Sequence, residues 1–214
     1  MLIGKIIYFV RHGESELNIK GIRQGAEGSL SAQGRVQAEI TAKKFPKKKG
    51  RPKVIISSPY ERARETAEII GKELGMKIEF CDLLIERRNP SQIIGRSIEE
   101  REVRIVVDQM DKTFHDDNFR YSDEENFLDL KERAKKLLAY IKKRKEKRII
   151  MVTHMIFLKV IIAHMLYGQE LTASLYNTLS YFNPIDNAGM TIVKYVPHWF
   201  KRDEWKILAW NDEG

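Results

Sequence analysis

The sequence has only one cysteine, Cys81, among its 214 residues. A single cysteine cannot form an internal disulfide, so we expect the reducing cytoplasm as the setting of this protein. Long apolar runs are also missing, because no stretch approaches the roughly 18 apolar residues of a membrane span. The apolar start from Met1 to Phe9 is short and lacks a basic region and a cleavage site. It predicts a first strand in place of a signal peptide, and no membrane partner is expected.

Internal repeats and low-complexity linkers are absent as well. With 43% hydrophobic and 32% charged residues, the composition is typical of a globular chain, and residues 1–214 are expected to form a single domain. The net charge of +8 would suit an anionic partner, either phosphate esters or a nucleic acid. However, the basic runs at 47–53 and 142–148 fit an exposed loop and a helix end. Neither run interleaves aromatic residues, so no nucleic-acid partner is expected.

Short, continuous apolar runs define the strands of the predicted fold. Such runs are typical of strands buried on both faces of a parallel sheet. Strands are expected at residues 4–10, 54–56, 149–152, 189–196 and 205–210, with a short one within 76–96. Helices are expected at 31–45, 60–74, 97–113, 156–167 and 173–181, with another that opens at Ser122. The alternation predicts an α/β fold: a three-layer αβα domain with a mostly parallel central sheet and a helical cap insertion at about 88–121.

Two of these helices allow more detailed predictions. Ser31 can cap the helix that follows it, whose buried positions are predicted to include Val36, Ile40 and Phe45. The run Ser122-Asp123-Glu124-Glu125 fits a capping box. The apolar face of the helix behind it is predicted to hold Leu128, Leu130, Leu137, Leu138 and Ile141. Residues 13–30 show no periodicity and predict a long loop, a length that is usually functional.

Unusual polar residues follow three of the predicted strands. They are Arg11-His12-Gly13-Glu14-Ser15 with Asn18, then Ser57-Ser58-Pro59 with Arg62, and finally Thr153-His154. Because the carboxyl ends of parallel strands meet at one edge of a sheet, we expect these side chains to converge. Two histidines and two arginines in one small volume repel each other unless an anion lies between them. A phosphoryl group fits, because guanidinium groups match phosphate oxygens in a bidentate way.

These segments resemble the histidine phosphatase superfamily, in its phosphoglycerate-mutase-like branch. The matching pieces, in family order over about residues 5–195, are Arg11 to Ser15 with Asn18, Leu30-Ser31 with Gly34 and Gln37-Ala38, Ser57-Ser58-Pro59 with Arg62-Ala63 and Thr66-Ala67, Glu86, Val152-Thr153-His154, and Asn187 to Val193. A lone Arg-His-Gly would be weak evidence, whereas five ordered pieces followed by the late-strand match at 187–193 are strong evidence.

The resemblance implies a role for each residue. His12 would attack phosphorus and form a phosphohistidine, and flanking Arg11 and Arg62 would disfavour its imidazolium form. The two arginines would also bind the phosphoryl oxygens, and His154 would hydrogen-bond the same group. Asn18, Ser15, Gln24 and Gly25 are further candidates for substrate contact. Three of these residues also have purely structural interpretations: His12 as a core histidine, Arg62 on a solvated helix face and Asn18 as a turn residue.

The general acid is identified by elimination between branches of the family. One branch places its acid directly after the second histidine, but Met155 and Ile156 stand there. The other branch uses a glutamate near the middle of the chain, and Glu86 fits. The alternative for Glu86 is a salt bridge with a neighbouring arginine.

Other enzyme classes fit less well. Cys81 and Arg87 satisfy the C-x5-R spacing of cysteine phosphatases, but the loop between them is bulky and holds two carboxylates. The five histidines form no metal-ligand spacing, so no metal and no cofactor are expected. A non-catalytic phosphoprotein-binding module stays open as an alternative. A module of that kind would tend to lose the nucleophile or the acid, and here both are present.

Mutase and phosphatase share the phosphohistidine and differ in the acceptor of the phosphoryl group. The phosphoglycerate mutases of the family carry a Gly-Trp pair after the first motif and a Tyr-Gly pair after the acidic glutamate. Neither pair is found in 23–27 or 86–91, so the resemblance favours hydrolysis of a phosphate monoester over mutase-type transfer. The expected substrate is a small phosphorylated metabolite or a phosphoprotein, and the sequence carries no signal for the oligomeric state.

Overall fold

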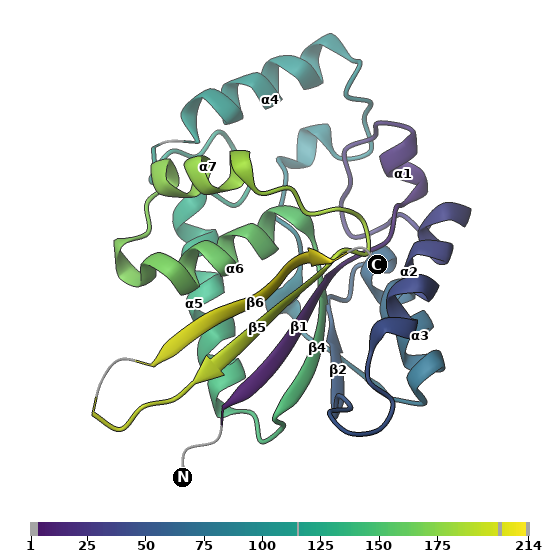
Figure 1. Cartoon of the computed structure of the whole chain (residues 1–214). Helices are drawn as coiled ribbons and strands as arrows, with labels where there is room; N and C mark the ends of the chain where they lie inside the picture. Colours follow the sequence, from purple (N-terminus) through teal and green to yellow (C-terminus); the bar gives the residue numbers. More distant parts are fainter. Residues whose placement is uncertain (1–3, 115, 201–202, 213–214) are drawn as a thin grey trace.

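The computed structural model describes residues 4–114, 116–200 and 203–212. A six-stranded sheet, in the order β3-β2-β4-β1-β5-β6, forms the middle of the molecule (Figure 1). The strands are β1 (Lys5–Arg11), β2 (Val54–Ser57), β3 (Ile78–Phe80), β4 (Arg148–Thr153), β5 (Met190–Val196) and β6 (Glu204–Asp212). β1 to β4 are mutually parallel, whereas β5 is antiparallel to β1 and β6, at the outer edge, is antiparallel to β5. The predicted mostly parallel α/β sheet is confirmed.

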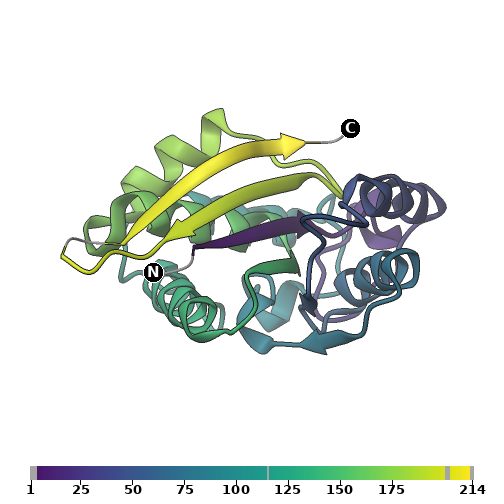
Figure 2. The same cartoon turned by 60° about the horizontal axis from the view of Figure 1, so that its bottom comes forward.

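Helices cover both faces of this sheet (Figure 2). They are α1 (Glu16–Ile19), α2 (Ala32–Lys44), α3 (Glu61–Leu74), α4 (Arg101–Thr113), α5 (Phe127–Lys143), α6 (Met155–Tyr167) and α7 (Ala173–Phe182), with the 3₁₀ turns η1 (Asp82–Leu84), η2 (Ser91–Ile93) and η3 (Gly168–Glu170). α2 and α3 lie on one face, and α5, α6 and α7 lie on the other. No helix of the described ranges is both long and apolar enough to cross a membrane.

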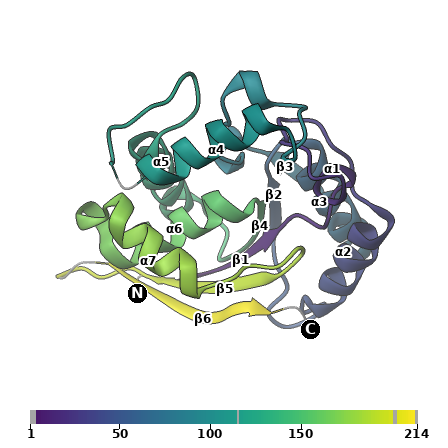
Figure 3. The same cartoon turned by 90° about the horizontal axis from the view of Figure 1, so that it is seen from above.

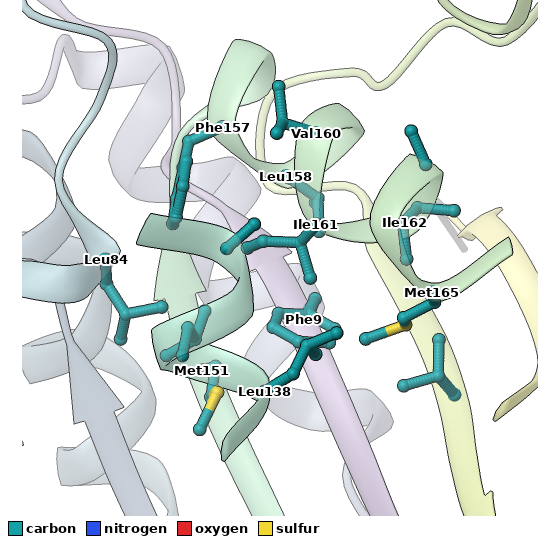
Figure 4. Close-up of a cluster of buried hydrophobic side chains, with 14 of the residues drawn as sticks. Phe9, Leu84, Leu138, Met151, Phe157, Leu158, Val160, Ile161, Ile162 and Met165 are labelled. Carbon is teal, nitrogen blue, oxygen red and sulfur yellow. The ribbon is translucent and has the colours of Figure 1, made fainter. Parts of the chain in front are cut away.

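Successive residues of the central strands point to opposite faces and so supply two hydrophobic cores. Phe9 and Met151 pack with α5 and α6 in the larger core, and Figure 4 shows them beneath side chains of α6. Their neighbours Val10 and Ile150 pack with α2 and α3 in the smaller core. Burial on both faces explains why the strands read as continuous apolar runs.

The segment at 88–121, where a cap was expected, has a small core of its own. Ile93 of η2 packs with Val103, Val106 and Met110 of α4. Figures 1 and 3 show α4 beyond the edge of the sheet at which β1 ends. Arg23 joins this segment to the 13–30 loop, because its backbone N–H donates to Arg96 O at 2.9 Å and its carbonyl accepts from Gly95 N at 2.8 Å.

Helix α5 begins later than predicted. Its N-cap is Asn126, which forms a capping box with Asp129, and the box predicted at Ser122 does not form. The Glu124 carboxylate instead accepts the N–H groups of Tyr121 and Ser122 and stabilises a turn before the helix. Leu128, predicted on the apolar face, is 37% exposed, because Phe127 turns inward in its place.

The buried face of α2 also differs from the prediction. Val36 and Ile40 are 46% and 48% exposed, whereas Phe45 is buried as expected. The face that packs inward carries small residues, Gly34 and Ala38 among them. This choice follows from the neighbouring loop: a Cβ at Gly34 would lie only 2.0 Å from the carbonyl oxygen of Glu14. The long loop itself contains the one-turn helix α1, which was not predicted.

Candidate active site

The ends of three parallel strands bring the predicted histidines and arginine together. His12 follows β1, His154 is the N-cap of α6 directly after β4, and Arg62 lies in the first turn of α3 after β2. All three are buried, with exposed fractions of 4%, 0% and 2%. The two imidazole rings have centroids 5.0 Å apart. The convergence expected from the sequence is therefore present.

His12 is held in one orientation by its own neighbourhood. Nδ1 lies 2.7 Å from the carbonyl oxygen of Gly13, which can only accept, so Nδ1 carries the proton and donates. That tautomer leaves a lone pair on Nε2, and Nε of Arg62 lies 3.3 Å from it. Burial, followed by the charges of Arg62 and Arg11, holds the pKa of His12 well below its ordinary value. The imidazole is therefore neutral and nucleophilic at physiological pH.

The loop that carries His12 is fixed by side chains from α2 and α3. Thr66 Oγ1 accepts the N–H of Gly13 at 3.0 Å, and Gln37 Oε1 accepts the N–H of Glu14 at 2.9 Å. Gly34 allows the helix backbone to approach this loop without a clash. Gly34, Gln37 and Thr66, which carried part of the family resemblance, thus position the loop of His12 and do not line the cleft.

Arg11 and Arg62 are each anchored to a backbone carbonyl. One terminal nitrogen of Arg62 donates to Gly25 O at 3.0 Å, and one of Arg11 donates to Ile185 O at 2.6 Å. Burial lowers the pKa of Arg62 to about 10 and also lowers that of Arg11. Both guanidinium groups are charged at neutral pH, and an anion between them would relieve their repulsion.

His154 is buried with one nitrogen satisfied. Its Nε2 lies 2.9 Å from the hydroxyl oxygen of Ser58, and its Nδ1 has no hydrogen-bond partner among the described residues. The ring packs edge-on against Tyr60, with centroids 5.4 Å apart. Burial and the charge of Arg62 lower the pKa of His154 well below its ordinary value. Its neutral ring can donate a single hydrogen bond.

Glu86 occupies the N-terminus of α6. Its carboxylate accepts the N–H of Ile156 at 3.2 Å and the N–H of Phe157 at 3.0 Å. Within the described ranges it forms no ion pair, so the predicted alternative of a salt bridge with a neighbouring arginine is not observed. A side chain therefore already accepts the N–H groups at this helix N-terminus.

The four loop candidates have different surroundings. Asn18 and Gln24 line the cleft beside His12. Ser15 is buried, and its hydroxyl lies 2.9 Å from both Asn18 Oδ1 and Gln24 Oε1. Gly25 offers its carbonyl to Arg62. The positions of Ser15 and Gly25 suit support of the site, and direct contact of either residue with a substrate stays a prediction.

Most of these residues line a cleft of about 260 Å³, but Ser15, Gly25 and His154 do not. We call Arg11, His12, Arg62 and the fully buried His154 next to His12 the floor of the site, because they lie at or shortly after the ends of parallel strands. We call Arg23, Arg87 and Asn89 its rim, and the sequence analysis did not identify the two arginines as site residues. Arg23 and Arg87 each adjoin a predicted site residue in the chain, Gln24 and Glu86, and that adjacency was the one available signal. The lining consists of Arg11, His12, Leu17, Asn18, Gly21, Ile22, Arg23, Gln24, Arg62, Glu86, Arg87, Asn89, Ile98, Met155 and Ile156.

A larger hollow of about 750 Å³ lies at the other end of α6, where Lys135, His164 and Trp205 contribute to its wall. None of the predicted site residues lines it. The candidate residues therefore gather at the smaller cleft, whose lining holds one histidine, four arginines and a single carboxylate, with His154 buried next to His12.

The fold and the site together define an α/β protein with a histidine and arginine site at the ends of its parallel strands. Residues 7–213 match the histidine phosphatase superfamily (branch 1). The chain belongs to this family, and the resemblance seen in the sequence is confirmed at the level of the family.

Individual relatives and structures are similar to this chain over different lengths. A phosphoserine phosphatase candidate of Hydrogenobacter thermophilus is 43% identical over 83 residues, which are 38% of this chain and 40% of that protein. The chain spans less than half the length of the curated relatives it matches. Mycobacterial glucosyl-3-phosphoglycerate phosphatase with VO₃ has a TM-score of 0.76 at 21% identity, covering 97% of this chain and 99% of that one.

A second solved structure is similar over nearly its whole length. A mutant of phosphoserine phosphatase from Entamoeba histolytica, in complex with phosphoserine, has a TM-score of 0.72 at 23% identity. The match covers 98% of each chain. At these identities the two structures support the shared fold.

Proposed function

We propose that this protein is a phosphatase that hydrolyses a phosphate monoester through a phosphohistidine at Nε2 of His12. The observation that carries the proposal is the state of that imidazole. Its Nδ1–H is bound to the Gly13 carbonyl, its Nε2 lone pair is directed to the Arg62 guanidinium, and its pKa is low. A neutral nucleophile beside fixed cations is the arrangement that attack on a phosphoryl group requires.

In the first step, Nε2 of His12 attacks phosphorus and the bond to the ester oxygen breaks. Arg11 and Arg62 neutralise charge on the phosphoryl oxygens, and His154 donates a hydrogen bond to the same group. The departing alkoxide takes a proton from Glu86, which lines the same cleft. The products of this step are the free alcohol and the phosphohistidine.

In the second step, a water molecule attacks the phosphorus of the phosphohistidine. Glu86, now a carboxylate, takes a proton from that water, and the N–P bond breaks. Inorganic phosphate leaves, and His12 returns to the neutral tautomer. The Gly13 carbonyl can accept the hydrogen bond from Nδ1–H through both steps, so the ring need not reorient between them.

Hydrolysis is favoured over mutase-type transfer because the Gly-Trp and Tyr-Gly pairs of the phosphoglycerate mutases are missing. The small volume of the cleft suits a phosphorylated metabolite, since it lies at or below the usual range for ligand sites, roughly 300–1,000 Å³. Isomerisation of 3-phosphoglycerate in the presence of the bisphosphate cofactor should therefore be slower than hydrolysis. Mutase turnover that exceeds hydrolysis would contradict this assignment.

The mechanism is tested by trapping the intermediate. Wild-type protein is mixed with p-nitrophenyl phosphate, quenched in alkali and digested, and mass spectrometry locates the added phosphoryl group. We expect it on His12, and we expect His12→Ala to lose at least about 10⁴-fold in kcat/KM. His198→Gln, a change at a histidine remote from the cleft, is the matched control. Unchanged turnover in His12→Ala would refute the mechanism.

A further inference from the structure

The rim of the cleft holds two arginines that the proposed chemistry does not use. Arg23 and Arg87 line the same cleft as His12. The buried Nε of each has no hydrogen-bond partner among the described residues. Within the same ranges, neither guanidinium forms a salt bridge. Two buried donors without acceptors are costly unless a ligand supplies the acceptors.

The two rim arginines are also close enough to repel each other. The charge of Arg87 lowers the pKa of Arg23, in addition to the larger effect of burial. Asp111 of the 88–121 segment opposes this effect, but it makes no ion pair with Arg23. The lining of the cleft therefore contains four arginines against one carboxylate, Glu86. A scissile phosphoryl group bound at Arg11 and Arg62 would leave the rim charges uncompensated.

Defined contacts place the backbone of Arg23 and the side chain of Arg87. The backbone of Arg23 is clamped by two hydrogen bonds to residues 95 and 96. The Arg87 guanidinium lies over the ring of Phe114, 5.2 Å from its centroid, and its backbone N–H donates to Glu86 Oε1. Asn89 reaches Gln24 O at 3.4 Å and closes the rim between them. The pair is thus preorganised, which lowers the entropic cost of binding an anion there.

From these observations we infer that Arg23 and Arg87 form a second anion-binding subsite, which selects phosphate monoesters that carry another anionic group, a carboxylate or a second phosphate. The inference rests on the proposed phosphatase function, because it assumes that the scissile phosphoryl group occupies the floor. A guanidinium pair can bind either group in a bidentate way. The substrate is thereby a small metabolite with two anionic ends.

Matched substrates measure this selection. 3-Phosphoglycerate and sn-glycerol 3-phosphate differ in a carboxylate against a hydroxymethyl group, and fructose 1,6-bisphosphate and fructose 1-phosphate differ in a second phosphate. We expect wild-type kcat/KM to favour the doubly anionic member of at least one pair by about 10-fold to 100-fold. The pair that shows the larger ratio identifies the preferred second anion.

Variants assign the preference to the rim. Arg23→Gln and Arg87→Gln should each lower the ratio about tenfold, whereas the ratio should be kept in Arg88→Gln, the exposed neighbour outside the cleft. A wild-type ratio near 1 in both pairs, or a ratio that survives both rim variants, would overturn the inference.

A binding experiment separates this inference from the proposed function. Calorimetry with His12→Ala protein compares 3-phosphoglycerate with sn-glycerol 3-phosphate, and fructose 1,6-bisphosphate with fructose 1-phosphate, without any turnover. One outcome is that the protein prefers the doubly anionic ligand, that Arg87→Gln removes this preference, and that wild type does not hydrolyse p-nitrophenyl phosphate. This outcome would support the subsite and reject the phosphatase. Hydrolysis that depends on His12, with no preference in binding or turnover, would reject the subsite and keep the phosphatase.

Discussion

The floor and the rim of the cleft hold their arginines in different ways. Arg11 and Arg62 each donate to a backbone carbonyl, and Arg62 also donates to His12. The side chains of Arg23 and Arg87 make no hydrogen bond among the described residues, and their buried Nε atoms lack a partner, as does Nε of Arg11. The floor belongs to the sheet and its two cores, whereas the rim belongs to loops: Arg23 is bonded to residues 95 and 96, and Arg87 lies over Phe114. We infer that the floor residues carry out the proposed reaction, and that the rim arginines select the substrate.

Loss of a floor arginine should give the largest difference between the two regions. Arg62→Gln removes charge stabilisation that every substrate needs, so kcat should fall about 10²-fold to 10³-fold. The loss should be the same for p-nitrophenyl phosphate and for a doubly anionic ester. Arg64→Gln, an exposed change on the same helix, should be close to wild type. If Arg62→Gln lowered kcat for doubly anionic substrates alone, the proposed difference in role between floor and rim would be contradicted.

Glu86 offers a second test that distinguishes the chemical step from the selection of the substrate. Glu86→Gln removes the transferable proton, so kcat for an alkyl phosphate should fall about 10²-fold. The loss for p-nitrophenyl phosphate should be smaller, because p-nitrophenolate leaves without a proton. Stopped-time assays with both esters measure the contrast, with Asp82→Asn, exposed in the preceding turn, as the control. Equal losses for the two esters would contradict the role of Glu86 as the general acid.

A smaller, pH-dependent effect should appear in the stability of the floor. His12 and His154 have pKa values well below the ordinary 6.5 in the folded protein. Below about pH 6.5 the unfolded chain binds protons that the folded state does not. The free energy of unfolding should therefore fall with falling pH, by up to roughly 1.4 kcal/mol per pH unit for each histidine. Above pH 6.5 this contribution should be constant.

Urea unfolding of wild type and His12→Ala at pH 5.0, 6.0 and 7.5 isolates the share of His12. The variant should lose less stability than wild type between pH 6.0 and 5.0, since it lacks one of the two histidines. Identical pH dependence in the two proteins would show that His12 is not the group responsible. The acidic limb of wild-type kcat/KM should also lie below pH 6.5, because protonation of His12 removes the nucleophile.

The floor was predictable from the sequence, and the rim was not. Strands buried on both faces read as apolar runs, and parallel topology then places His12, Arg62 and His154 at one edge. Arg23 and Arg87 lie in loops without periodicity, so nothing local shows which way they point. Their place in the cleft depends on contacts with residues 95–96 and with Phe114, which are distant in the chain.

The errors in the fold have two origins. Val36 and Ile40 were predicted to be buried from their apolar character, but the close approach of Gly34 to Glu14 decides which face of α2 packs inward. The start of α5 was predicted too early, because the Glu124 carboxylate accepts the N–H groups of Tyr121 and Ser122 and stabilises a turn there. In α2 a tertiary contact decides the outcome, whereas at α5 a competing local hydrogen-bond pattern does. Glu86 was identified from the resemblance, while its bonds to the amides of α6 were visible only in the structure.

The position of β1 between two strands that come late in the sequence determines when the site can form during synthesis. β1 is made before the other strands of the sheet, yet its two neighbours, β4 and β5, begin at residues 148 and 190. Pairings so distant in sequence form late and slow the folding of the chain. Until the ribosome has added β4 and β5, His12 has neither its neighbouring strands nor the ring of His154. The arrangement on which the proposed reaction depends thus cannot form in the nascent chain until those strands have been synthesised.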